Sequence, residues 1–436
     1  MSEQKKLRVE NIENKHIKFY IEAHNVYINM RFIYNSIIED WTFLHTAVDQ
    51  SDEDLVEYLL EKGADPNINV KIYGTPLHVA VKKGNLDIIK NLLKHGADIN
   101  VRGDMCENFT VLEYAVQHDN IEAYKILTDR VNMLDPVLMC IALKYNSKKI
   151  LDAYLTENIE ANYRSKDYGS LLHCAVHSNN LDAIERLIKY GADINYACSY
   201  NNGTGLWDYS DLTALQIAVI FNKMKAVKLL VQKHADVNIC ADDDEAALSL
   251  AISMTCHDDV INDLLYAGAD IGKIDLSKYV GRESIKKLIK KQAVKLNVAK
   301  LYVSEKHLET IADDRELIDF RNRCIEEIED MKKIKISMSG VNFYSLLRKN
   351  YHQLALYAKN DVIRSAVLET DFLGTHFPLY AGIVSSRFRK GLERKNLLVK
   401  IENFVFDVFH DLPDTFVRNI FLYLSNGDLE SLQSRL

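Results

Sequence analysis

The sequence predicts an all-α fold, a solenoid of tandem helical repeats, on the strength of two recurring phrases. The first is written most fully as Gly96-Ala97-Asp98-Ile99-Asn100, and variants of it begin at Gly63, Gly191, His234 and Gly268. The second, Thr75-Pro76-Leu77-His78-Val79-Ala80, precedes the first at a fixed offset. The spacing from Gly63 to Gly96 is 33 residues and that from His234 to Gly268 is 34, which is the length of one helix-pair repeat.

Each repeat should form a helix, a turn, a second helix and a loop. Thr75 is suited to cap a helix with its hydroxyl, and Pro76 fits the first helical position, where no N–H is needed. Gly84-Asn85 then interrupts the helix, a second apolar helix follows over residues 86–93, and Gly96 ends it. Such a unit cannot bury its apolar face alone, so neighbouring units must stack. We expect four side chains in the core between repeats: Leu77, Ala80, Leu92 and Leu93.

Seven units are legible from their helix starts. These are Thr42, Thr75, Thr110, Val137, Ser170, Thr213 and Ala246. With the Gly-Ala-Asp-Ile-Asn phrase in phase, this pattern resembles the ankyrin repeat over residues 42–275. The resemblance implies paired antiparallel helices with an outward loop, the finger, between repeats.

Two departures from the period single out particular loops. Thr110 to Val137 is only 27 residues, so we expect the finger near residues 128–132 to be lost. Ser170 to Thr213 is 43 residues, and the long loop at 196–212 carries Tyr200, Trp207 and Tyr209. Aromatic residues on a loop suit partner binding, so these three are candidate target-binding residues. The alternative is that Trp207 folds back to pack on the solenoid.

The flanks of the array differ from the repeats. Residues 1–41 are expected to form an N-terminal helical cap or a degenerate repeat, and residues 276–340 a helical linker and C-terminal cap. The lysines between Lys286 and Lys300 fit a solvated helix face better than a nucleic-acid-binding stripe. Residues 341–436 lack the repeat phrases and should be a separate helical module.

The C-terminal module carries two informative segments, Phe377-Pro378-Leu379-Tyr380 and a final apolar helix face. That face consists of Leu412, Pro413, Ile420, Phe421 and Leu424. It resembles the first half of an F-box, and with ankyrin repeats upstream the chain resembles the ankyrin and PRANC proteins of poxviruses. The chain reaches Leu436 too soon after Leu412 for the later helices of a full F-box, which weakens the inference that a ligase is recruited.

Composition narrows the function classes. The formal net charge is −8 and argues against a large nucleic-acid-binding surface. Seven cysteines without a CxxC pair suggest reduced thiols in the cytoplasm or nucleus, and no segment resembles a signal peptide or a membrane span. His173 and His177 are a weak metal pair, and Gly203-Thr204-Gly205 lacks the features of a phosphate loop. We therefore expect no enzyme activity, no cofactor and no metal.

The poxvirus resemblance implies a substrate-recruiting adaptor. The repeats would bind a host protein. The C-terminal face, Leu412, Pro413, Ile420, Phe421 and Leu424, would dock on the Skp-type adaptor of a cullin ubiquitin ligase and so modulate host ubiquitination or antiviral signalling. The alternative is an ankyrin module that sequesters or inhibits a host signalling protein without a ligase. The expected location is the host cytoplasm, with the nucleus second.

Overall fold

A computed structural model describes most of the chain. The described residues are 8–9, 17–19, 21–22, 27–34, 38–103, 108–128, 136–155, 159–165, 168–198, 211–241, 245–278, 281–312, 314–336, 339–369, 371–408, 421, 424 and 428–429. The chain divides into two compact units, one holding most residues up to Asp193 and the other most residues from Ile194 on.

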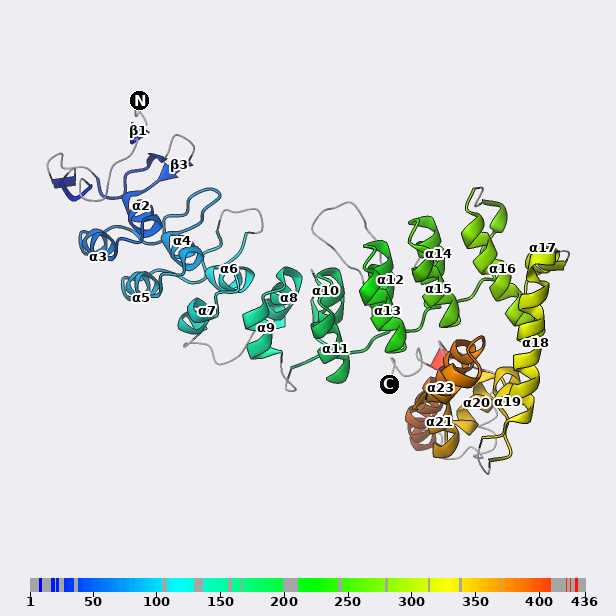
Figure 1. Cartoon of the computed structure of the whole chain (residues 1–436). Helices are drawn as coiled ribbons and strands as arrows, with labels where there is room; N and C mark the ends of the chain where they lie inside the picture. The colour runs from blue at the N-terminus through cyan, green and yellow to red at the C-terminus, as the bar shows by residue number, and fades with distance from the viewer. Residues whose placement is uncertain are drawn as a thin grey trace. The chain divides into compact units, whose positions relative to one another are not determined.

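The first unit is a stack of helix pairs (Figure 1). The pairs are α2 (Phe43–Asp49) with α3 (Glu53–Glu61), α4 (Pro76–Lys83) with α5 (Leu86–Lys94), α6 (Val111–Gln117) with α7 (Ile121–Thr128), α8 (Pro136–Tyr145) with α9 (Lys148–Tyr154), and α10 (Leu171–His177) with α11 (Leu181–Lys189). The first helices of successive pairs contact one another from α2 through α10, and the second helices do so from α3 through α7. We call these the first-helix row and the second-helix row.

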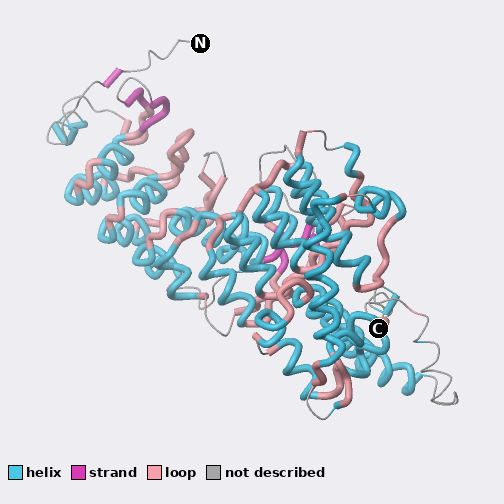
Figure 2. Tube along the Cα trace, turned by 45° about the vertical axis from the view of Figure 1, so that its right-hand side comes forward, coloured by secondary structure: helices cyan, strands magenta, loops and turns pink. Residues whose placement is uncertain are grey.

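The second unit continues with repeats and then changes character. Its described helices are α12 (Ala214–Ile220), α13 (Met224–Gln232), α14 (Ala247–Ser253), α15 (Asp258–Tyr266), η1 (Leu276–Lys278), α16 (Glu283–Val298), α17 (Glu305–Ala312), η2 (Arg315–Leu317), α18 (Ile318–Lys333), α19 (Phe343–Arg348), α20 (Tyr351–Tyr357), α21 (Asp361–Leu368), α22 (Phe372–His376) and α23 (Ala381–Val408). Figure 2 shows that helix dominates the described chain. The predicted all-α class is confirmed, as a repeat stack with additional C-terminal helices.

Helices begin at every predicted start. Thr42, Thr110, Ser170 and Thr213 each accept a hydrogen bond from the backbone N–H three residues on, as helix-capping side chains do. The helix expected at Val137 begins one residue earlier, at Pro136. The predicted core residues Leu77, Ala80 and Leu92 are fully buried, whereas Leu93 is only half-buried.

The Gly-Ala-Asp-Ile-Asn phrase connects neighbouring repeats through its polar residues. The Asp98 carboxylate accepts from Asn100 N at 2.9 Å, which closes the turn. The Asn67 side chain reaches the next repeat: its Oδ1 accepts from Asp98 N at 2.8 Å and its Nδ2 donates to Gly96 O at 3.1 Å. The same pattern recurs at Asn162 and Asn238. The phrase therefore recurs because each asparagine satisfies backbone groups of the following unit.

Residues before α2 contain short strands as well as helical turns. Strand β2 (Phe32–Tyr34) pairs with β1 (Arg8–Val9) in parallel and with β3 (Ile38–Trp41) antiparallel. A helical cap or a degenerate repeat was expected here, and these strands were not predicted. Asn29 Oδ1 accepts from Asp65 N at 2.8 Å, so Asn29 occupies the place that Asn67 holds one repeat later.

Two small hairpins form the bases of later fingers. They are β4 (Arg164–Ser165) with β5 (Gly169–Ser170), and β6 (Ala197–Cys198) with β7 (Leu212–Thr213).

Candidate partner-binding surface

In the first two repeats, the side chain at the fourth position of the first-helix phrase holds the next finger in place. His45 Nδ1 lies 2.7 Å from Thr42 Oγ1, and its Nε2 lies 3.2 Å from Gly74 O in the next finger. His78 repeats this arrangement with Thr75 Oγ1 at 2.9 Å and Phe109 O at 3.1 Å. Burial lowers the pKa of His45 to about 3 and that of His78 to about 4. Both imidazoles are therefore neutral at pH 7, so Nδ1 accepts from the cap and Nε2–H donates to the finger.

The first finger, Val70 to Gly74, has a fixed base and an unusual tip. Val70 is buried and exchanges two backbone hydrogen bonds with Gly74, at 2.9 and 2.8 Å. Gly74 has φ +76°, and a Cβ there would lie 2.8 Å from the His78 ring, so only glycine fits. Ile72, at the tip, also has a left-handed backbone, φ +75°, although its side chain is 66% exposed. Ile72 was not among the residues singled out from the sequence.

Basic and aromatic side chains surround this finger. Tyr73 meets the Trp41 ring edge-on, with centroids 5.1 Å apart, and Lys82 Nζ lies 5.6 Å from the Tyr73 ring centroid. Farther along the first-helix row, Lys144 Nζ lies over the rings of Tyr145 and Tyr168, 5.3 and 5.5 Å from their centroids. Cation–π contacts of this kind hold the ammonium groups close to aromatic faces at the surface.

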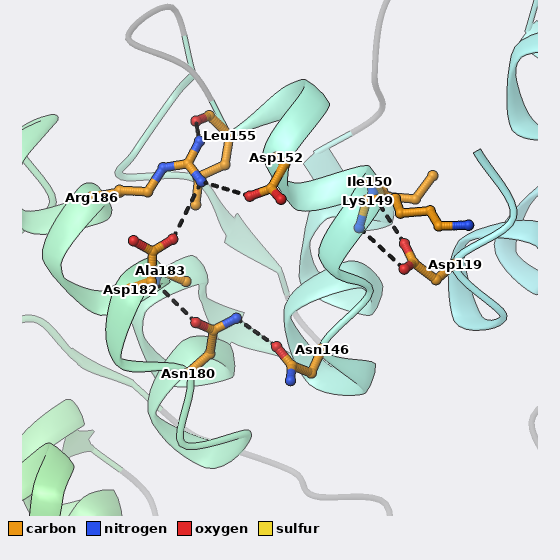
Figure 3. A network of polar contacts seen from close by, with 10 residues as sticks. All are labelled: Asp119, Asn146, Lys149, Ile150, Asp152, Leu155, Asn180, Asp182, Ala183 and Arg186. Carbon is orange, nitrogen blue, oxygen red and sulfur yellow. Dashed lines mark hydrogen bonds and ion pairs between the residues drawn. The ribbon is translucent and has the colours of Figure 1, made fainter.

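The repeat that follows the short spacing, α8 with α9, is secured by its neighbours (Figure 3). Asp119, in the turn after α6, accepts from the backbone N–H groups of Lys149 and Ile150 at 3.1 and 3.0 Å, and so caps α9 from the preceding repeat. From the following repeat, Arg186 reaches Asp152 at 3.5 Å and donates to the Leu155 carbonyl at the end of α9. The loss of the finger expected near residues 128–132 concerns residues 129–135, which lie outside the described residues.

The Phe377-Pro378-Leu379-Tyr380 segment anchors the C-terminal helices. The Glu327 carboxylate on α18 accepts from Leu379 N at 3.0 Å and from Tyr380 N at 2.9 Å, directly before α23. Tyr380 is fully buried and its hydroxyl donates to Lys295 O on α16 at 2.9 Å. Burial raises the pKa of Glu327, and the hydrogen bonds from the Leu379 and Tyr380 backbone lower it by less. The phrase is therefore a structural joint between α23 and the helices that follow the repeats.

Helix α23 also packs directly on the last repeats through small residues. A Cβ added to Gly382 would lie 1.6 Å from the Tyr266 carbonyl oxygen at the end of α15, so the two backbones touch there. Two turns further along, Lys390 Nζ pairs with Asp236 at 3.2 Å. A cavity of about 340 Å³ opens beside this contact, lined by residues of α13, α15 and α21 to α23. This interface was not predicted from the sequence, since a helical glycine and lysine carry no distinctive signal.

Most of the predicted site residues lie outside the described part of the chain. Those residues are Tyr200, Trp207, Tyr209, Leu412, Pro413 and Ile420. Phe421 is described and is buried in a small apolar cluster with Leu397 and Ile401 of α23 and with Leu429. Leu424 packs against the same cluster and is half-buried. Their assignment as partner-binding residues stays a prediction.

None of the described helices has the length and apolar character that a membrane span requires. The same residues contain no group of three or more His, Cys, Asp or Glu side chains placed to hold a metal ion.

Comparison with known proteins identifies the repeats. The family profile described as ankyrin repeats in three copies matches residues 44–139, and a second ankyrin profile matches residues 172–231. The chain contains ankyrin repeats. Among curated proteins, the ankyrin repeat protein FPV031 of fowlpox virus is 26% identical over 309 residues, 67% of this chain and 80% of that protein. FPV216 of the same virus is 28% identical over 241 residues, which is 52% of this chain and 76% of that protein.

Solved structures include two ankyrin domains similar to this one. The ankyrin repeat domain of Bcl-3 is 22% identical, with a TM-score of 0.39, and the match covers 51% of this chain and 98% of that domain. The ankyrin repeat domain of human ASB11 is 20% identical, with a TM-score of 0.40, and the match covers 52% of this chain and 97% of that domain.

Proposed function

We propose that this ankyrin-repeat chain is a non-catalytic adaptor of the poxvirus ankyrin and PRANC type. Its repeats capture a host protein in the cytoplasm, or in the nucleus, and its C-terminal module docks on the Skp-type adaptor of a cullin ubiquitin ligase. The chain then acts by bringing two partners together, since proximity raises the effective concentration of one at the other. The outcome would be altered host ubiquitination or antiviral signalling.

The observation that carries this proposal is the packing of α23 on the last repeats. Gly382 lies against the Tyr266 backbone, and Lys390 pairs with Asp236 while both side chains are largely buried. A small module joined this way is held on the last repeats of the second unit, as an adaptor between two proteins needs. Leu424 adds support, because it leaves part of an apolar side chain uncovered, and apolar surface at such a position suits docking.

One observation favours a second candidate, a sequestering module without a ligase. Phe421 and Leu429 are buried against α23, so part of the apolar face predicted to dock is used inside the chain. A segment that only completes the fold would use its apolar residues in this way.

A pair of variants separates the two candidates. Leu424→Asp places a charge on the half-buried edge of the cluster, whereas Phe421→Ala removes a buried ring. Under the adaptor proposal, Leu424→Asp loses co-purification of the Skp-type adaptor and cullin from host cells while the melting temperature is retained. Phe421→Ala lowers the stability of the module by about 3–5 kcal/mol. If the wild-type chain never retains cullin under gentle lysis, the sequestering module is the better account.

A further inference from the structure

The tip of the first finger combines an unfavourable backbone conformation with an exposed apolar side chain. Ile72 is held at φ +75° and is 66% exposed. A β-branched residue is rare in this backbone region, whereas glycine or asparagine adopts it readily. Because the Ile72 side chain is exposed, burial within the chain does not offset the free-energy cost of this backbone conformation. Such outliers gather at functional sites, where the conformation serves something other than the stability of the free protein.

The charges around this tip are positive. Lys71 and Lys82 are exposed and form no ion pair within the described residues. The two carboxylates carried by the described first helices α2, α4 and α6 are already paired: Asp49 with Lys83 at 2.8 Å and Glu113 with Arg102 at 3.2 Å. Lys82 also contributes to the lowering of the pKa of His118, behind desolvation, so its charge acts along the first-helix row.

We infer that the first finger anchors an extended acidic segment of the captured protein. An apolar side chain of that segment packs on Ile72 and Tyr73, and its carboxylates pair with Lys71 and Lys82. This inference rests on the proposed function, because it names the chemistry of the protein that the repeats capture.

A protein segment fits this surface better than a nucleic acid. Side chains of an extended peptide are about 3.3 Å apart along the chain and alternate in direction, so carboxylates can be placed opposite the lysines alone. A continuous phosphate backbone would also meet Asp49 and Glu113 in the same row. An apolar tip such as Ile72 matches a peptide side chain and gains nothing from a phosphate.

The test begins with selection of a ligand. A random dodecapeptide library displayed on phage is panned on the full chain and, in parallel, on the Lys71→Glu/Lys82→Glu variant. We expect the wild type alone to enrich peptides in which Asp or Glu flanks an apolar residue. Equal enrichment on both proteins, or a consensus without acidic residues, overturns the inference.

The affinity of the most enriched synthetic peptide is then measured by fluorescence anisotropy. Ile72→Gly should weaken binding about tenfold or more while the melting temperature stays equal or rises, because glycine adopts this backbone freely. Lys94→Glu/Lys125→Glu, the matched control on the second-helix row, should bind as the wild type does. Unchanged affinity in Ile72→Gly, a lower melting temperature in that variant, or tighter binding of a 20-base-pair DNA duplex would each contradict the inference.

The peptide-binding test of the finger and the cullin co-purification test of the proposed function can fail independently of each other. Ile72→Gly should still retain cullin, and Leu424→Asp should still bind the peptide. If no peptide is selected while the wild type retains cullin, only the finger inference fails. If the peptide binds and cullin is never retained, only the ligase proposal fails.

Discussion

At the scale of single residues, one position performs the same task with two different side chains. His45 and His78 bridge their own helix cap to the next finger, and Gln216 does so with Oε1 2.8 Å from Thr213 N and Nε2 2.9 Å from Glu245 O. Glu113, at the same position, accepts from Thr110 N at 2.7 Å and so caps its own helix, and it pairs with Arg102 at 3.2 Å. The requirement is one acceptor and one donor, whatever residue type provides them.

This requirement makes stability depend on pH. Burial depresses the folded-state pKa of His45 to about 3 and of His78 to about 4, below the unfolded value near 6.5. The unfolded chain therefore binds more protons as the pH falls, and the stability that the neutral imidazoles give above pH 6.5 is lost progressively toward pH 3–4. Between pH 7 and pH 5 the loss should be on the order of 2 kcal/mol per histidine.

The His45→Gln/His78→Gln variant checks this prediction. Glutamine retains both bonds, as Gln216 does, and carries no charge, so urea unfolding of the variant should lose less stability between pH 7 and pH 5. Equal pH slopes for the variant and the wild type would contradict the argument.

At the scale of elements, helix starts were predictable because their signals are local. Thr42 and Ser170 cap helices within three residues of themselves, so a short window of sequence contains the whole interaction. Strand β1 pairs Arg8 with Ile33, a partner that no local pattern specifies. The contact of Gly382 with Tyr266 was missed for the same reason, as was Ile72, whose meaning depends on its backbone angle.

Substitution of Gly382 tests the contact between α23 and the last repeats. Gly382→Ala would place a methyl group 1.6 Å from the Tyr266 carbonyl oxygen, so α23 must move away from α15. We expect faster amide hydrogen exchange in α23 and a lower melting temperature. Ser385→Ala, on the same helix, is the control and should match the wild type. Unchanged exchange in α23 of the Gly382→Ala variant would mean that α23 does not depend on the repeats.

At the scale of the molecule, the side-chain hydrogen bonds between the described repeats join adjacent repeats. Asn67 reaches Gly96 and Asp98, His78 reaches Phe109, and Asp119 reaches α9. Stability should then approximate a sum of unit and nearest-neighbour contributions. The C-terminal module is the exception, since Lys390 contacts Asp236 from far along the chain.

A cavity within one repeat tests this additivity. Leu92 is fully buried, so Leu92→Ala should cost about 2–5 kcal/mol. The adjacent Leu93→Ala, at a half-buried position, is the matched control and should cost less. Because α5 contacts α3, α4 and α7, amide protection should fall most in those helices and least in α23, which belongs to the other unit. Uniform loss of protection from α2 to α23 would show that the chain unfolds as one cooperative body, contrary to a repeat array coupled only through neighbours.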